Sequence, residues 1–123
     1  MTNRLANVWR AAARLIACAA SAALLAHALP AAAAKRIIVI GNMQFHPSTV
    51  VVERGDKLVW VNRDLVPHTA TAAGMFDSAA IAQGGSWSYR ASTPGRYAYG
   101  CSLHPGMKAV LIVEKKRGRP ASR

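Results

Sequence analysis

Cysteine is scarce in this chain, and helical patterning is missing from most of it. Two of the 123 residues are cysteines, Cys18 and Cys101. Because Cys18 lies in an N-terminal segment that we expect to be removed, no disulfide is expected to staple the fold. From residue 35 onward the apolar residues show no helical spacing, and no segment of the sequence repeats. These absences argue against a helical bundle and against a repeat protein.

Acidic residues are also few, which leaves the chain strongly basic. Five Asp and Glu stand against 16 Lys and Arg, for a formal net charge of +11. Five of the basic residues fall in the last nine positions, 115–123, whereas residues 35–114 carry a net charge of only +3. The last nine positions hold no apolar residue larger than alanine, so we expect a disordered basic tail there. The remaining length suits one domain and is too short for two.

The first 34 residues have the three-part pattern of a secretory signal peptide. Basic residues come first, an uncharged stretch rich in Ala and Leu spans residues 15–29, and small residues follow. We expect cleavage after Ala34, with Ala28 as the second choice, and a mature protein in the periplasm. A retained membrane anchor is the alternative, because the apolar stretch is about long enough to span a bilayer. Its high alanine content, with a histidine and a proline, argues against that alternative.

Short β-rich runs, separated by Gly, Pro and Asp, follow one another through residues 35–114. The runs at 57–62, 86–90 and 96–101 place successive side chains on opposite faces, as strands with one buried face do. The runs lie at residues 36–40, 49–53, 57–62, 69–72, 86–90, 96–101 and 109–114. One helical turn is expected at residues 78–81, and Tyr97 is placed like the tyrosine of a Greek-key corner. Seven or eight strands predict an all-β fold, an antiparallel Greek-key β-sandwich.

Three metal-binding side chains lie within seven residues of one loop. Cys101 is followed by His104 three residues later and by Met107 three residues after that. A thiolate, an imidazole and a thioether are ligands of copper electron-transfer sites, which also use a second histidine. Of the two other histidines after the predicted signal, His68 ends a loop that leaves a predicted strand, whereas His46 looks like a turn residue. A buried metal thiolate would also explain an unpaired cysteine in an oxidising compartment.

The sequence resembles the cupredoxins, the family of small blue copper proteins. The resemblance runs from about residue 37 to residue 113, nearly the whole predicted domain. Its motifs are ERGD at 53–56, WVN at 60–62, PH at 67–68 and CSLHPGM at 101–107. The ligand loop is most similar to that of the amicyanins, since plastocyanin and pseudoazurin have longer loops between His and Met.

This resemblance implies one type 1 copper per chain. His68, Cys101 and His104 would be the strong ligands and Met107 the weak axial ligand. Asn62 would hydrogen-bond across to the Cys101 loop and tether it. An apolar collar around His104 would serve brief contacts with redox partners. The collar residues would be Leu103, Pro105, Gly106, Pro67 and either Met75 or Phe76.

The function implied is that of a periplasmic electron-transfer protein that cycles Cu(II) and Cu(I). It would be a monomer without enzymatic activity, and its redox partners would have acidic docking surfaces. The main alternative is a periplasmic copper carrier or buffer with no electron-transfer role. Zinc is the chemical rival for the site, although a thioether ligand argues against it. Copper oxidases and nitrite reductases need further copper ligands, which one spare histidine cannot supply.

Two further motifs resemble binding sites of other kinds. Met43 and His46 have a spacing that could serve a secondary copper-loading site, although Met43 fits a strand edge or the core equally well. Residues 117–120, RGRP, resemble the core of the AT-hook, which binds the minor groove of DNA. A secreted protein rarely meets chromosomal DNA, so we expect no nucleic-acid partner. We also expect no stable membrane insertion once the signal is removed.

Overall fold

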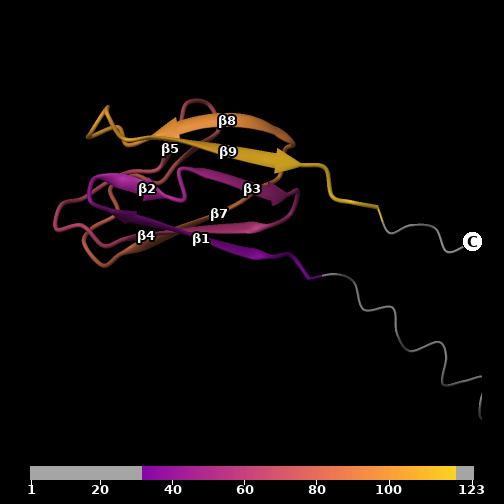
Figure 1. Cartoon of the computed structure of the whole chain (residues 1–123), viewed down its shortest axis with the longest axis horizontal. Coiled ribbons are helices and arrows are strands. Elements are labelled where there is room, and N and C mark those ends of the chain that lie inside the picture. Colours follow the sequence, from indigo (N-terminus) through magenta and orange to yellow (C-terminus); the bar gives the residue numbers. More distant parts are fainter. Residues whose placement is uncertain (1–31, 119–123) are drawn as a thin grey trace, which may run out of the picture. The chain divides into compact units, whose positions relative to one another are not determined.

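The computed structural model describes residues 32–118, which form two β-sheets and no helix. The strands are β1 (Lys35–Gly41), β2 (Gln44–His46), β3 (Thr49–Glu53), β4 (Lys57–Asn62), β5 (Thr71–Ala72), β6 (Phe76–Asp77), β7 (Ser86–Arg90), β8 (Gly95–Gly100) and β9 (Lys108–Glu114). One sheet has the order β2-β1-β4-β7 and the other β3-β9-β8-β5-β6, and the two pack as a sandwich (Figure 1). The predicted all-β sandwich is therefore confirmed.

The strand pairing is mixed rather than wholly antiparallel. β1 pairs with β4 in parallel, and β3 pairs with β9 in parallel, while the other pairs run antiparallel. The sequence pattern did not predict the parallel pairs, because it indicates which face of a strand is buried but not the direction of the neighbouring strand. The described part of the chain forms nine strands rather than seven or eight, and β2 and β6 were not expected. The helical turn expected at residues 78–81 is wrong, since Ile81 forms an isolated β-bridge with His68.

The core lies between the sheets and is built from the inward residues of each alternating strand. Trp60 in β4 is fully buried, and its ring packs against the rings of Phe76, Trp87 and Tyr99. The Trp60 indole N–H donates to the Tyr99 hydroxyl at 3.3 Å. Burial is the largest influence on that hydroxyl and raises the pKa of Tyr99 to about 12, so Tyr99 stays neutral.

A tyrosine corner closes the turn that leads into β8. The Tyr97 hydroxyl donates to the Thr93 carbonyl at 2.7 Å, as its placement in the sequence predicted. Gly95 has a φ of +155°, and a Cβ there would stand 2.8 Å from the Tyr97 hydroxyl. The corner therefore needs glycine at this position both for backbone angle and for space.

Most of the predicted signal segment, residues 1–31, and the end of the predicted tail, residues 119–123, lie outside the described residues. Residues 115–118 have no regular secondary structure. Within residues 32–118 there is no helix of the length and hydrophobicity needed to cross a membrane.

Candidate metal centre

Three donor atoms from separate parts of the chain meet at one end of the sandwich. His68 follows the loop that leaves β4, Cys101 follows β8, and His104 lies in the loop between β8 and β9. The Nδ1 atoms of the two histidines are 3.1 Å apart. The Cys101 Sγ lies 3.8 Å from His68 Nδ1 and 3.6 Å from His104 Nδ1. Among residues 32–118, this is the one group of three or more His, Cys, Asp or Glu side chains placed to share a metal ion.

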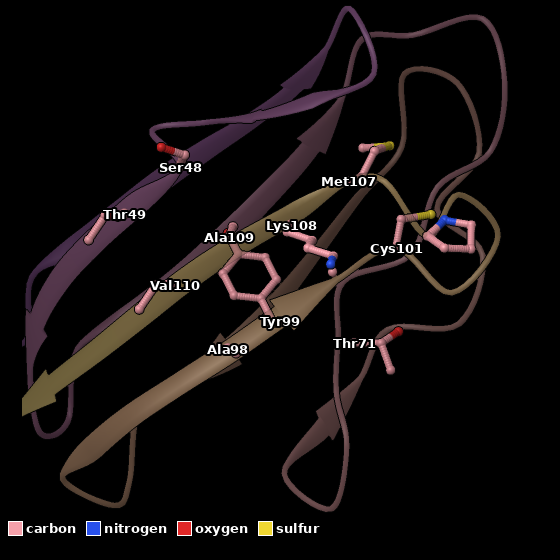
Figure 2. A pocket seen from close by; sticks show the side chains of 12 residues that line it. Ser48, Thr49, Thr71, Ala98, Tyr99, Cys101, Met107, Lys108, Ala109 and Val110 are labelled. Atoms are coloured by element: carbon pink, nitrogen blue, oxygen red, sulfur yellow. The ribbon is translucent and has the colours of Figure 1, made fainter.

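The spacing of these donors fits a metal ion close to their plane. A point about 2 Å from all three atoms exists in that plane, and metal–imidazole and metal–thiolate bonds are about 2.0–2.3 Å long. Met107 is 4% exposed and precedes β9. Figure 2 shows it beside Cys101, at the neighbouring ends of β9 and β8. Two imidazoles, a thiolate and a nearby thioether form the donor set that suits copper rather than zinc.

Backbone hydrogen bonds hold the ligand loop in a compact shape. The Cys101 N–H donates to the Met107 carbonyl at 3.2 Å, and the Met107 N–H donates to the His104 carbonyl at 2.9 Å. The His104 N–H donates to the Cys101 carbonyl at 3.3 Å. Gly100 lies close against this loop, since a Cβ there would stand 2.6 Å from the Met107 carbonyl oxygen. The loop geometry thus depends on the absence of a side chain at the end of β8.

The surroundings of Cys101 favour its thiolate form. Burial is the largest influence and by itself raises the pKa of the thiol. The backbone N–H of Thr69, 3.3 Å from Sγ, and the two imidazoles more than offset burial. Together they lower the pKa of Cys101 from 9.0 to about 6. At neutral pH the sulfur is therefore largely in the form that binds metal ions.

Asp64 sets the orientation and the tautomer of His68. The buried His68 ring donates from Nε2 to Asp64 Oδ2 at 2.8 Å, which leaves the Nδ1 lone pair facing the other donors. Asp64 also accepts the backbone N–H groups of Asn42 and Met43, at 2.7 Å and 2.9 Å. Both turn residues have positive φ, 52° and 60°. The hydrogen bond from Met43 is the largest influence that lowers the pKa of Asp64, so the carboxylate is ionised.

Asn62 does not tether the Cys101 loop, so that prediction is wrong. Its side-chain amide donates to the carbonyls of Val66 and Ile81, both at 2.9 Å. Its Oδ1 accepts the N–H of Asp64 at 3.0 Å. Asn62 therefore shapes the loop that carries His68.

The tether to the cysteine loop comes from Thr69, which the sequence reasoning missed. The Thr69 Oγ1 accepts the Ser102 N–H at 2.9 Å, and the two hydroxyls lie 3.1 Å apart. Its backbone N–H points at the Cys101 sulfur. Its position was the available signal, because a polar residue directly after a histidine of the donor cluster shares that histidine's loop and faces the same neighbours.

Exposed apolar residues lie on the two loops that carry His68 and His104. Leu103 is 54% exposed, as expected for a collar residue, but Phe76 is 8% exposed and lies in the core. Met75 packs against the core as well. Leu65 and Val66, which were not predicted, are 82% and 41% exposed on the loop before His68. We define the apolar collar as Leu65, Val66, Pro67, Leu103, Pro105 and Gly106, all of which are exposed.

Two surface hollows border the ligand loop. An open depression of ≈ 690 Å³ runs along β8 and β9 and reaches Cys101 and Met107 at one end (Figure 2). A second hollow, of ≈ 350 Å³, is lined by Met43, His46 and Met107. His46 Nε2 lies 3.2 Å from the Gly41 carbonyl, and neither His46 nor Met43 belongs to the three-donor cluster.

One family model and several curated proteins match this chain. Residues 14–113 match the family described as the cupredoxin-like domain. Amicyanin-alpha from Methylorubrum extorquens is 31% identical over 113 residues, which are 84% of this chain and 95% of that protein. Amicyanin from Paracoccus denitrificans is 30% identical, over 63% of this chain and 64% of that protein. Plastocyanin from Tetradesmus obliquus is 32% identical, over 60% and 61%.

Solved structures agree with this assignment at the level of the fold. A Cu(I) form of an amicyanin mutant has a TM-score of 0.63 at 25% identity and covers 69% of this chain and 87% of that one. A copper-containing nitrite reductase from Thermus scotoductus also has a TM-score of 0.63, at 22% identity, but only 23% of that chain is covered. The chain therefore belongs to the cupredoxin family and has one type 1 copper as its cofactor.

Proposed function

We propose that this protein is a monomeric, periplasmic electron carrier that passes single electrons between redox partners. His68, Cys101 and His104 would be the strong copper ligands, and Met107 the weak axial one. The observation that carries the proposal is the cluster of three donors spaced 3.1–3.8 Å apart beside a buried thioether. Copper in such a set supplies one-electron Cu(II)/Cu(I) chemistry.

The way the protein holds its donors favours electron transfer over metal delivery. Asp64 fixes the ring of His68, Thr69 fixes the sulfur of Cys101, and the backbone of the ligand loop fixes His104. Donors that are held from outside keep one arrangement in both oxidation states, which lowers the cost of gaining or losing an electron. A protein that hands over its metal would instead need donors that separate easily.

The surface around His104 suits short-lived contacts with other redox proteins. His104 is the one partly exposed member of the three-donor cluster, and the apolar collar lies on its loop and on the loop before His68. Small interfaces of this kind are typical of electron-transfer encounters. Arg63 and Lys108 are exposed on the same half of the fold, so acidic side chains of a partner would meet these two residues.

The other parts of the proposal concern processing and activity. The signal-peptide pattern supports export, with residues 35–114 as the copper domain and 115–123 as a tail. Ala34 already takes part in the fold, because its N–H donates to Asp56 Oδ1 and its carbonyl accepts the Lys57 N–H, each at 2.9 Å. A cut after Ala28 would keep both bonds. We infer a carrier role without enzymatic activity because a copper oxidase or reductase needs further copper ligands, and His46 is the one spare histidine after the predicted signal.

The test is to titrate the purified protein with Cu(II) and record the visible spectrum. One equivalent should produce an intense thiolate-to-copper band that Cys101→Ser abolishes and that a reductant bleaches reversibly. A colourless complex, or a band that survives in Cys101→Ser, would contradict the assigned ligands.

The competing role, a copper carrier or buffer, is separated by metal exchange. With a Cu(I) chelator in excess, an electron carrier should lose copper far more slowly than it exchanges electrons with a small redox reagent. Loss of copper within the time of one electron exchange would favour the carrier role instead.

A further inference from the structure

The basic residues of the described chain gather at one end of the sandwich. β1, β4 and β8 begin at this end, because Lys35 pairs with Lys57, Lys57 pairs with Arg90, and the start of β8 pairs with the end of β9. Nine of the eleven Lys and Arg in residues 32–118 lie there, and all nine are exposed. These nine residues, which we call the basic pole, are Lys35, Arg36, Arg54, Lys57, Arg90, Arg96, Lys115, Lys116 and Arg117.

Few acidic groups balance the basic pole. Glu53, Asp56 and Glu114 lie at the same end, which leaves an excess of six positive charges. The Asp56 carboxylate is buried and already accepts the N–H groups of Ala34 and Glu53. The rest of the described chain carries two basic and two acidic residues, so its formal charge is zero. The net charge of the fold is therefore concentrated at one end.

The basic pole and the metal centre lie at opposite ends of the fold. His68 and Cys101 follow the carboxyl ends of β4 and β8, whereas the basic pole lies at their amino ends. Figure 1 shows the loop between β8 and β9 at the end away from the start of β1 and the end of β9. Six-residue strands separate the two ends by about 20 Å, roughly twice the distance over which physiological salt screens charge.

We propose that the basic pole binds the surface of a membrane rich in anionic phospholipid, so that the metal end points away from the bilayer. A membrane surface attracts a group of Lys and Arg through their summed charge and requires no matching shape. A specific protein partner would instead need an apolar centre in the interface. The exposed large apolar residues do not gather at the basic pole: four of the six, Met43, Leu65, Val66 and Leu103, lie at the other end.

The path of the chain favours a membrane over an acidic protein as the binding partner of the basic pole. The described residues begin at Ala32, three residues before β1 starts at the basic pole. The uncharged stretch at residues 15–29 precedes them in the sequence, so this end of the fold would be next to the bilayer until the signal segment is cleaved. β9 ends at the basic pole as well, and the residues beyond it add Arg119 and Arg123 in the sequence. The first strand and the last strand therefore both join their flanking segments at the basic pole.

The test compares two charge-reversal pairs with equal change in net charge. Arg36→Glu with Arg96→Glu alters the basic pole, and Arg63→Glu with Lys108→Glu alters the metal-side half. Copper-loaded protein as exported is mixed with vesicles of phosphatidylglycerol and phosphatidylethanolamine, and the bound fraction is measured by sedimentation. The pole pair should lower the partition coefficient at least about tenfold, and the matched pair less than about threefold. An unchanged copper spectrum in both variants shows that each is folded.

Three results would overturn the proposal. One is an equal loss of binding in the two pairs, and another is equal binding to phosphatidylcholine vesicles. The third is complete release of vesicle-bound protein by soluble poly-glutamate that carries the same total negative charge as the vesicles. That result would mean that the basic pole binds an acidic protein. Release of bound protein as ionic strength rises from about 0.05 M to about 0.5 M would support it.

Discussion

Removing the carboxylate of Asp64 tests how the protein orients His68, the first proposed histidine ligand. Asp64→Ala leaves the Nε2–H of His68 without its acceptor, inside a ring that is fully buried. Asp64 also accepts hydrogen bonds from two backbone N–H groups. These groups belong to exposed turn residues, so water can replace the carboxylate as their acceptor. The substitution therefore acts mainly on His68.

This substitution should lower both the stability of the metal-free protein and its affinity for Cu(II). A buried donor without an acceptor costs about 1–3 kcal/mol, which should appear in the free energy of unfolding of the metal-free protein. The proton of His68 would also be free to move to Nδ1, the atom that faces the other donors. Loss of a partner that fixes a ligand histidine lowers metal affinity by about 10–100-fold, and we expect Cu(II) affinity to fall by that amount.

Competition titration with a Cu(II) chelator measures the affinity, and urea unfolding measures the stability. Asp77→Ala is the matched control, because Asp77 accepts the Ala79 N–H and the Thr71 hydroxyl but contacts no histidine. If the Cu(II) affinities of the two variants differ by less than about threefold, whatever their stability, Asp64 does not prepare His68 for metal binding.

Three further predictions follow from hydrogen bonds and close packing. Tyr97→Phe removes the bond to the Thr93 carbonyl and should lower the free energy of urea unfolding by about 1 kcal/mol, whereas no change would mean that the corner contributes nothing. Gly100→Ala should cost about 1–3 kcal/mol and shift the visible copper band, because its Cβ would meet the Met107 carbonyl; a wild-type spectrum would contradict this. Because folding lowers the pKa of Cys101 from 9.0 to about 6, its stabilising effect is complete above pH 9 and is lost as pH falls to 6. The unfolding free energy of metal-free protein should thus rise between pH 6 and pH 9 by about 1–2 kcal/mol, since solvent screening keeps it below the ~4 kcal/mol of three pKa units; Cys101→Ser should lack this rise.

One part of the metal centre was predictable because its information is local, whereas His68 lies 33 residues before Cys101 and its role was implied by the family resemblance. Cys101, His104 and Met107 lie in one short loop, so their spacing already implies that they meet. The strands were predictable because β-branched and aromatic residues form short runs between turn residues, whereas the burial of every second residue in β4 and β9 is seen only in the structure. Both signals are carried by neighbours in sequence, which need no knowledge of the rest of the fold.

The supporting contacts could not be predicted, because they depend on which loops meet in space. Asp64 reaches the β1–β2 turn more than twenty residues earlier, and Thr69 reaches Ser102 more than thirty residues later. Asn62 had the right position for a tether but bonds within its own loop and to Ile81. Phe76 lies in a strand of two residues, which is too short for alternation to show that it faces the core.

The separation of charge from the metal centre leads to one more expectation, about salt and electron transfer. In the metal-side half, Arg63 and Lys108 are balanced by Asp64 and Asp77, and the basic pole lies about 20 Å away. Because charges at that distance are largely screened at physiological ionic strength, the rate of electron exchange with a protein partner should change less than about threefold between 0.05 M and 0.5 M salt. Binding to anionic vesicles should be lost over the same interval. A steep fall of the exchange rate would mean that the basic pole itself contacts the partner, and the division of the molecule into a membrane end and an electron-transfer end would then be wrong.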